Sequence, residues 1–308
     1  MDKNLAVKIK SLENETLKNI RLSKAQNTLR AYKSDFQDFI SFCNINNLTS
    51  LPAEPKTVSL YITHLSKTFK TSTLKRRLVS ISTIHKAKGF YIDIKHPLIV
   101  ENFYGIKRVK GSYQKSKKPV LLEDLKKILN SIDSLNQNTI KKLRDKTILS
   151  LGFCGGFRRS ELVDLTFKDI EFVKEGVKIF IKKSKSDQSG EGMTKAIPYF
   201  ENKTFCPVNL LSEWININNI KDENEKIFNL SDKMVSLILK KYLKILGYDP
   251  LPYSGHSLRS GFATTAADKG ADERSIMNIT GHKSVQMVRR YIKETNLFKN
   301  NPLNKIDL

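Results

Sequence analysis

The chain has 308 residues, and its 54 lysines and arginines against 31 aspartates and glutamates give a formal net charge of +23 at neutral pH. Three scattered cysteines without a CxxC pair argue against a disulfide framework and against a cysteine zinc site. No apolar stretch approaches the roughly 18 residues that cross a bilayer, and the amino terminus lacks a signal-peptide core. The length predicts two domains, and we expect a cytoplasmic protein without a membrane partner.

The large positive charge indicates a polyanionic partner. Cations are in excess in both the first third and the remainder of the chain. A surface of this kind is best used against nucleic acid, because neutralised phosphates release counterions on binding. The alternative is a lysine-rich surface that is only solvated. We favour nucleic acid binding over that alternative.

Apolar residues recur every three or four positions in the first third of the chain, which is the period of an amphipathic helix. Such stretches cover residues 27–43, 55–69, 74–84 and 100–106, with Ser72 as a candidate cap of the third. Together they predict a small bundle of four helices.

The third of these helices is rich in cations and has no carboxylate between residues 70 and 88. A charge run is usually a solvated helix face, but charges of one sign favour a surface that faces phosphate. The candidate DNA-binding residues here and just beyond are Lys70, Lys75, Arg76, Arg77, Lys86, Lys88, Lys107, Arg108 and Lys110. Residues 107–118 are polar with little periodicity, which predicts a basic linker between two domains.

The second part of the chain has one β region. Residues 170–174 and 177–182 flank a plausible tight turn at Glu175-Gly176, and a third strand is expected at 195–200. Helical patterns fill most of the rest, at 121–129, 140–153, 209–217, 232–246, 256–269, 273–280 and 284–293. The chain is therefore expected to be mainly α with a small antiparallel β-sheet.

Two clusters of polar residues lie at predicted helix starts. Arg158 follows two glycines, where helix N–H groups can meet an anion, but it could equally form a surface pair with Glu161. His256 and Arg259 are three residues apart and share a helix face, so they could address one phosphate. Close helix packing would explain the small residues around them as well.

Two further clusters are less specific when taken alone. His282 follows a glycine, and Tyr291 fits an amphipathic stripe that is typical of a packed core tyrosine. Lys185, with Lys183 as a close competitor, stands at the exit of the second strand. A lysine there can reach into a cleft as a proton donor, although most such lysines are solvated.

The ordered set of these clusters resembles the active-site signature of the tyrosine recombinase (phage integrase) family. It runs from an arginine with a glutamate three residues on, through a hairpin lysine, HxxR and GH, to a tyrosine nine residues later. The resemblance spans nearly the whole chain and implies a two-domain DNA clamp. Its parts are a helical core-binding (SAM-like) domain at 1–106, a basic linker at 107–118, an α+β catalytic domain at 119–294 and a tail at 295–308. In the family such tails dock on a neighbouring protomer, and folding back on its own domain is the alternative.

The resemblance also implies a role for each site residue. Arg158 and Arg259 would clamp the scissile phosphate, supported by Glu161. Lys185 would be the general acid and Tyr291 the nucleophile. His256 and His282 would hydrogen-bond the phosphate and take part in transfer of the tyrosine proton. Arginine forks bind phosphate oxygens bidentately, and a phenol can store the bond energy as a 3′-phosphotyrosine. No cofactor, ATP or metal is then expected, and no DxD-type or HExxH-type motif is evident.

The expected function is therefore site-specific recombination of double-stranded DNA by a tetramer, with accessory DNA-bending or directionality factors as further partners. The chain lacks the second histidine after Arg259 and the glutamine before Gly281 that are typical of the bacterial Xer subgroup. This favours a recombinase of a mobile element, phage or plasmid. A non-catalytic, sequence-specific DNA-binding regulator on the same fold and a type IB topoisomerase-like enzyme are the alternatives. The filled catalytic positions favour the recombinase.

Overall fold

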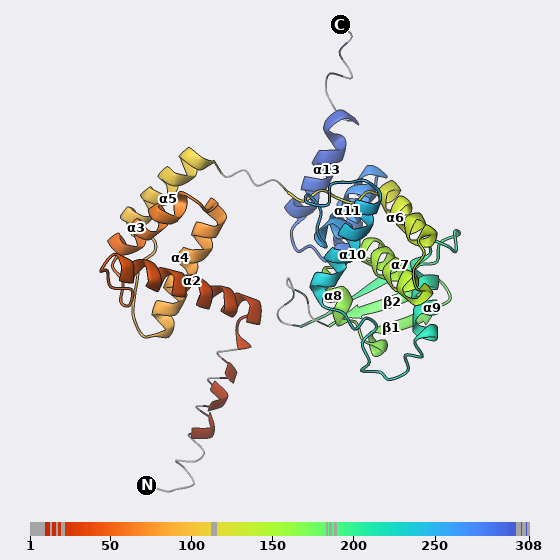
Figure 1. The fold of residues 1–308 in the computed structure, drawn as a ribbon, viewed down its shortest axis with the longest axis horizontal. Coiled ribbons are helices and arrows are strands. Elements are labelled where there is room, and N and C mark those ends of the chain that lie inside the picture. The colour runs from red at the N-terminus through yellow and green to blue at the C-terminus, as the bar shows by residue number, and fades with distance from the viewer. Residues whose placement is uncertain are drawn as a thin grey trace. The chain divides into compact units, whose positions relative to one another are not determined.

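The computed structural model describes residues 10–12, 14–16, 18–19, 22–111, 116–182, 184, 187, 190–299, 303 and 306, and for 293–299 it describes the backbone alone. The chain divides into two compact units, residues 1–115 and 116–308 (Figure 1). Within the described residues no helix is long and apolar enough to cross a membrane.

The helices of the first unit whose bounds are described are α2 (Gln26–Ile45), α3 (Pro55–Ser66), α4 (Thr71–Ala87) and α5 (Pro97–Lys110). Two of them begin with proline, whose missing N–H costs nothing at the first helical position. α2 packs on α4 and α3 packs on α5, around a core in which Phe39, Tyr61 and Leu74 are fully buried. The predicted bundle is confirmed.

Two details of this unit differ from the prediction. α4 begins at Thr71 after Lys70 and has no side-chain cap, so Ser72 lies inside the first turn and is not the cap. α5 continues through Lys110, so the first four residues of the predicted linker are helical. Cations suit this position because the last turn of a helix carries unpaired carbonyls and a partial negative charge. The ammonium of Lys110 also donates to the backbone carbonyl of Ser66.

A three-stranded antiparallel sheet lies in the second unit, in the order β1 (Ile170–Val173), β2 (Gly176–Ile181) and β3 (Met193–Pro198). Residues 174–175 form the turn between the first two strands, one position before the predicted turn. Burial alternates along β2 as the sequence predicted, because successive side chains of a strand point to opposite faces.

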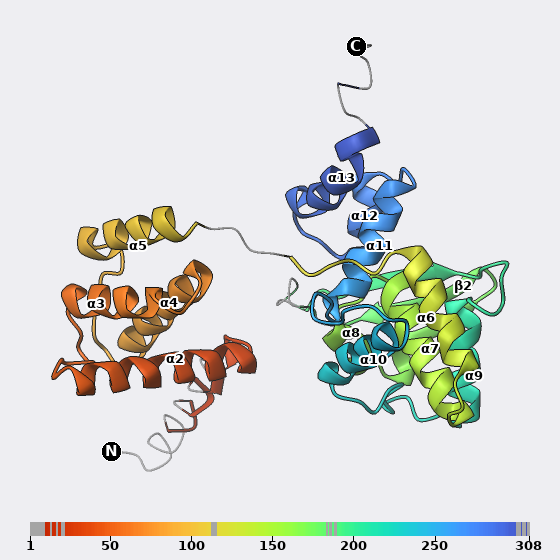
Figure 2. The ribbon, with the colours of Figure 1, turned by 45° about the horizontal axis from the view of Figure 1, so that its top comes forward.

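The helices of this unit include α9 and α12, which contact β3, and α6, α7 and α10, which lie side by side (Figure 2). Their bounds are α6 (Leu122–Ser134), α7 (Thr139–Cys154), α8 (Arg159–Asp164), α9 (Pro207–Ile217), α10 (Asp232–Ile245), α11 (His256–Asp268), α12 (Glu273–Thr280) and α13 (Val285–Lys299), with a short 3₁₀ turn at Phe167–Asp169. The expectation of a mainly α chain with a small antiparallel sheet is confirmed.

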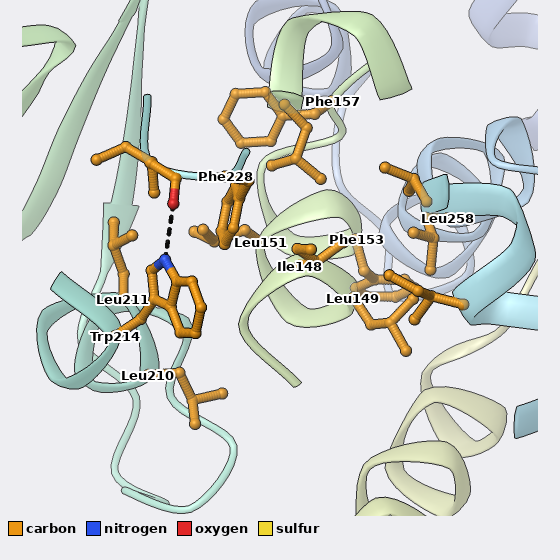
Figure 3. Packing of buried hydrophobic residues seen from close by; sticks show 14 of the residues in the cluster. Ile148, Leu149, Leu151, Phe153, Phe157, Leu210, Leu211, Trp214, Phe228 and Leu258 are labelled. Atoms are coloured by element: carbon orange, nitrogen blue, oxygen red, sulfur yellow. Dashed lines mark hydrogen bonds between the residues drawn. The ribbon is translucent and has the colours of Figure 1, made fainter. Parts of the chain in front are cut away.

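α7 lies at the centre of the core of this unit (Figure 3). At one end of the cluster Trp214 donates a 2.7 Å hydrogen bond to the carbonyl of Ile227 and stacks on Phe228. At the other end lies Leu258 of α11. A Cβ on Gly152 would stand 2.9 Å from a methyl of Leu258, so the glycine allows α11 to approach α7 closely. The core thus fixes the end of α7 and the start of α11, from which the site residues project.

Candidate active site

Arg158 lies where α7 gives way to α8. Gly156 adopts a left-handed conformation (φ 53°) that reverses the chain, and Arg158 then caps α8. The carboxylate of Glu161 accepts the Arg158 backbone N–H at 2.9 Å and its Nη1 at 2.5 Å. The predicted pair forms, but it is not on the surface, because the two side chains are only 19% and 3% exposed.

Arg259 is fully buried on the second turn of α11. Its Nη1 donates to the carbonyl of Gly156 at 2.8 Å, while Nε and Nη2 have no hydrogen-bond partner among the described residues. Burial and the nearby Arg158 lower the pKa of Arg259 to about 10, with Glu161 and Tyr291 acting in the opposite direction. Buried donors are rarely left unpaired, so this guanidinium is prepared for an anion.

His282 follows a left-handed glycine (Gly281, φ 64°) that ends α12. The Thr280 hydroxyl donates its one proton to the carbonyl of Ile276 at 2.6 Å, so it accepts at 2.7 Å from Nδ1–H of His282. Nε2 then carries the lone pair. Burial, followed by the positive charges of Arg259 and Arg158, lowers the pKa of His282 to about 3, so the imidazole is neutral.

Tyr291 lies on α13, which packs against α11. Its half-buried ring contacts the small cluster of Ala263, Ile276 and Val288, and its centroid is 6.1 Å from that of His282. It interacts electrostatically with Arg259 and raises the pKa of that guanidinium. Packing and proximity to the cationic site therefore occur together in this residue.

His256 is the first residue of α11 and is exposed. Its charged form contributes to lowering the pKa of His282, so the two imidazoles interact. These interactions connect the predicted site residues of the second unit into one group: Arg158, Glu161, His256, Arg259, His282 and Tyr291.

The profile of the "Phage integrase family" matches residues 120–297. A relative described as "Integrase/recombinase xerD homolog", from Selenomonas ruminantium, is 40% identical over 297 residues, which cover 92% of this chain and 86% of that protein. The chain belongs to the phage integrase family. As a member of this family of tyrosine recombinases, it is a DNA breaking and rejoining enzyme.

Solved structures of tyrosine recombinases share the fold of this family member. The XerH site-specific recombinase bound to palindromic difH substrate has a TM-score of 0.62 at 17% identity, covering 80% of this chain and 73% of that one. The Tn1549 transposon integrase in complex with transposon right end DNA also scores 0.62 at 17% identity, covering 89% and 92%. The expected fold is therefore confirmed.

The hairpin lysine is a prediction from the sequence. Lys185 and its competitor Lys183 both lie outside the described residues. They belong to the connection between the end of β2 at Ile181 and the start of β3 at Met193. In this connection Ser184 and Asp187 are described, and they form an isolated antiparallel bridge.

The sequence interpretation missed another lysine of the sheet, Lys195 on β3, which is 2% exposed. Its ammonium donates to the carbonyls of Gly155 at 2.6 Å and Ile279 at 2.5 Å. The period of two that places Ile197 inside also places Lys195 on the buried face, and this signal was available in the sequence.

The candidate DNA-binding cations of the first unit are exposed with one exception. Arg77 is only 8% exposed, and it donates to the carboxylate of Asp38 and to the hydroxyl of Tyr61. The guanidinium is used inside the bundle, which argues against the predicted contact of Arg77 with DNA. Arg76 pairs with Asp35 at 2.5 Å but keeps 44% of its side chain exposed.

Proposed function

We propose that this recombinase cuts and rejoins duplex DNA at a specific site, with Tyr291 as the nucleophile. The observation that carries the proposal is the state of Arg259. A guanidinium that is fully buried and keeps two N–H groups without a partner among the described residues is costly unless an anion completes the site. The neighbouring Arg158 and Tyr291 make a scissile phosphate the fitting anion.

The proposed reaction is an in-line displacement at phosphorus. The Tyr291 oxygen bonds to phosphorus as the bond to the 5′-oxygen breaks, leaving a 3′-phosphotyrosine and a free 5′-hydroxyl. Arg158 and Arg259 bind the non-bridging oxygens, and one such preorganised donor lowers the barrier by about 3 kcal/mol. Attack by another 5′-hydroxyl reverses the step and joins strands without ATP.

Two proton transfers accompany the displacement. The phenol proton goes to a neighbouring imidazole, and the neutral Nε2 of His282 and the exposed His256 are the candidates. The leaving 5′-oxygen takes a proton from the hairpin lysine, Lys185 or Lys183.

No group of three potential metal ligands occurs within the described ranges. The arginines supply the charge neutralisation that a metal supplies in other nucleases.

Binding to DNA uses the exposed cations of the first unit: Lys70, Lys75, Arg76, Lys86, Lys88, Lys107, Arg108 and Lys110. Four protomers assemble on two DNA sites, and accessory factors set the direction. Most of the tail at 295–308 lies outside the residues whose side chains are described, so its docking, on a neighbour or on its own domain, stays a prediction. The mobile-element role rests on the sequence departures from the Xer subgroup. A transposon integrase among the solved proteins of this fold is compatible with it.

The test begins by recovering the DNA trapped covalently on the protein in cells and sequencing its ends. A duplex with these ends, nicked beside the cleavage position, should then accumulate a covalent adduct with the wild type and none with Tyr291→Phe. Specific binding without any adduct would support the regulator instead. Relaxation of plasmids without the site would support the topoisomerase.

The sequenced ends of the trapped DNA also test the mobile-element role. Ends at the borders of a transferable DNA segment would support this role, whereas ends at a single chromosomal site would contradict it.

A further inference from the structure

Lys195 is a buried titratable residue that the proposed reaction does not use. It is 2% exposed, and its register partner on β2 is the fully buried Ile179. Its ammonium lies 4.6 Å from the centroid of the Phe157 ring, at cation–π distance. Burying a charge is costly unless it is well paired, so this lysine has a specific task inside the unit.

The two carbonyls that Lys195 binds belong to the two turns that present site residues. Gly155 lies in the turn that leads to Arg158, and the next carbonyl, of Gly156, holds Arg259. Ile279 is in the last turn of α12, beside Thr280, whose hydroxyl binds His282. One ammonium therefore connects the arginine turn to the histidine turn.

β3 touches the histidine turn at a second point. A Cβ on Gly281 would stand 2.8 Å from the sulfur of Met193, two residues before Lys195. The strand thus supports the turn by packing as well as by the hydrogen bond. Met193 is also the first residue of β3, so in the chain the same end of the strand follows the connection that contains Lys183 and Lys185.

Lys195 also interacts electrostatically with the site residues. Burial is the main cause that lowers the pKa of Lys195 to about 7; Glu161 opposes this shift, and the positive charges of Arg259 and Arg158 add to it. The charge of Lys195 in turn helps to lower the pKa of His282. Both its protonated and its neutral form can donate to two carbonyls, so the connection persists when the amine titrates.

We propose that Lys195 is a positioning residue for strand cleavage, which holds the turn of Arg158 and the turn of His282 at the spacing that one phosphate requires. The inference rests on the proposed function. We do not assign Lys195 as the proton donor to the leaving oxygen, because two of its three N–H bonds go to carbonyls, its ammonium lies against the ring of Phe157 and solvent hardly reaches it. Displacing a reacting group by about 1 Å can cost about 100-fold in rate, so the spacing matters for catalysis.

The primary variant is Lys195→Met, which keeps the length of the side chain and removes the donors. At saturating DNA we expect the cleavage rate constant to fall about 100-fold, with the DNA dissociation constant unchanged within about twofold. Lys178→Met on β2 is the matched control, since Lys178 is half exposed and pairs with Glu171 at the surface. It should cleave like the wild type. Wild-type cleavage by Lys195→Met would overturn the inference.

A double-mutant cycle with His282→Ala separates positioning from general loss of structure. If Lys195 acts through His282, Lys195→Met should lower the cleavage rate constant much less in the His282→Ala background than in the wild type. If the two residues act independently, the two reductions in rate should multiply in the double variant. Multiplying effects would overturn the inference. If Lys195→Met does not fold, the same cycle is run with Lys195→Arg, which keeps the charge but moves the donors.

A substrate with sulfur in place of the bridging 5′-oxygen tests the proton-donor alternative, because a thiolate leaves without being protonated. It should restore cleavage to a variant of the general acid and leave Lys195→Met slow. Restoration of Lys195→Met would overturn the positioning role. These outcomes require that the wild type forms the Tyr291 adduct, so a wild type without any adduct refutes the proposed function itself.

Discussion

The Nη1 of Arg259 donates a 2.8 Å hydrogen bond to the backbone carbonyl of Gly156, 103 residues earlier in the chain. This is the one hydrogen bond that the Arg259 side chain makes within the described residues. Gly156 belongs to the turn that sets the direction of Arg158. The bond therefore relates the two guanidiniums to each other in the free protein, which would reduce the reorganisation that the proposed phosphate binding requires.

Replacing Arg259 by Met should separate stability from catalysis. The variant loses one hydrogen bond but also removes a buried charge, so we expect the free energy of unfolding to change by less than about 1 kcal/mol. Cleavage should fall by about 10²- to 10³-fold. Urea unfolding followed by the fluorescence of Trp214, the one tryptophan of the chain, reports on the second unit. Loss of more than about 3 kcal/mol would assign Arg259 a structural role instead.

Gly156→Ala should impair both stability and cleavage. The left-handed conformation costs a non-glycine residue about 1–2 kcal/mol, and the new Cβ would stand 3.1 Å from a methyl of Thr280. Gly270→Ala is the matched control, since Gly270 is also left-handed (φ 84°) and has no atom within 4 Å of the new Cβ. It should show the backbone cost alone, with cleavage unchanged. Equal cleavage by the two variants would show that the crowding at Thr280 does not reach the site.

Helices and their order could be predicted from the sequence, because they depend on local periods. α12 has the predicted ends, Glu273 and Thr280. β2 shows the predicted alternation. The small residues near Arg259 do serve close packing, since a Cβ on Gly261 would overlap the carbonyl of Val120. These features follow from spacing and from residue size.

Partners that are distant in the chain could not be predicted in the same way. Arg77 was assigned to DNA because its own helix has no carboxylate, but Asp35 and Asp38 reach it from α2. Lys195 finds its two carbonyls 40 and 84 residues away. A period places a side chain on a face, but only the packing of several elements decides what the side chain meets there.

Lys75 and Arg77, two residues apart on α4, should respond differently to replacement by glutamine. Lys75 is exposed, so Lys75→Gln should weaken DNA binding and reduce the salt slope of log K by about 1. Arg77→Gln leaves Asp38 and Tyr61 without their cation and should destabilise the first unit by about 2 kcal/mol, since the half-exposed Asp38 can be solvated. DNA binding at several salt concentrations checks the salt slope of both variants, and melting followed by circular dichroism checks their stability. A changed salt slope in a fully folded Arg77→Gln would restore Arg77 to the DNA-binding surface.

Thr280→Val should disturb the tautomer of His282. Valine has the shape of threonine but cannot accept a hydrogen bond, so Nδ1–H loses its partner. The tautomer in which Nε2 is the unprotonated nitrogen then loses its support. Loss of one hydrogen bond of about 1.4 kcal/mol predicts about tenfold slower cleavage. Thr280→Ser, which keeps the acceptor, is the control. Nitrogen NMR of the imidazole in the free protein reads the tautomer directly, and an unchanged tautomer in Thr280→Val would contradict this assignment.

Stability above neutral pH should depend on Lys195. Its pKa is about 7 in the folded protein and 10.5 in the ordinary, solvated state, so between these values the unfolded chain binds more protons than the folded chain. The stability of the wild type should therefore rise with pH from about 7 to 10.5 by up to about 1.4 kcal/mol per pH unit relative to Lys195→Met, which lacks this proton. Below pH 7 both states are protonated and the difference between the two proteins should be constant. Parallel stability curves for the two proteins above pH 7 would mean that the ammonium stays charged in the fold, held by the carbonyls of Gly155 and Ile279 more strongly than burial opposes it.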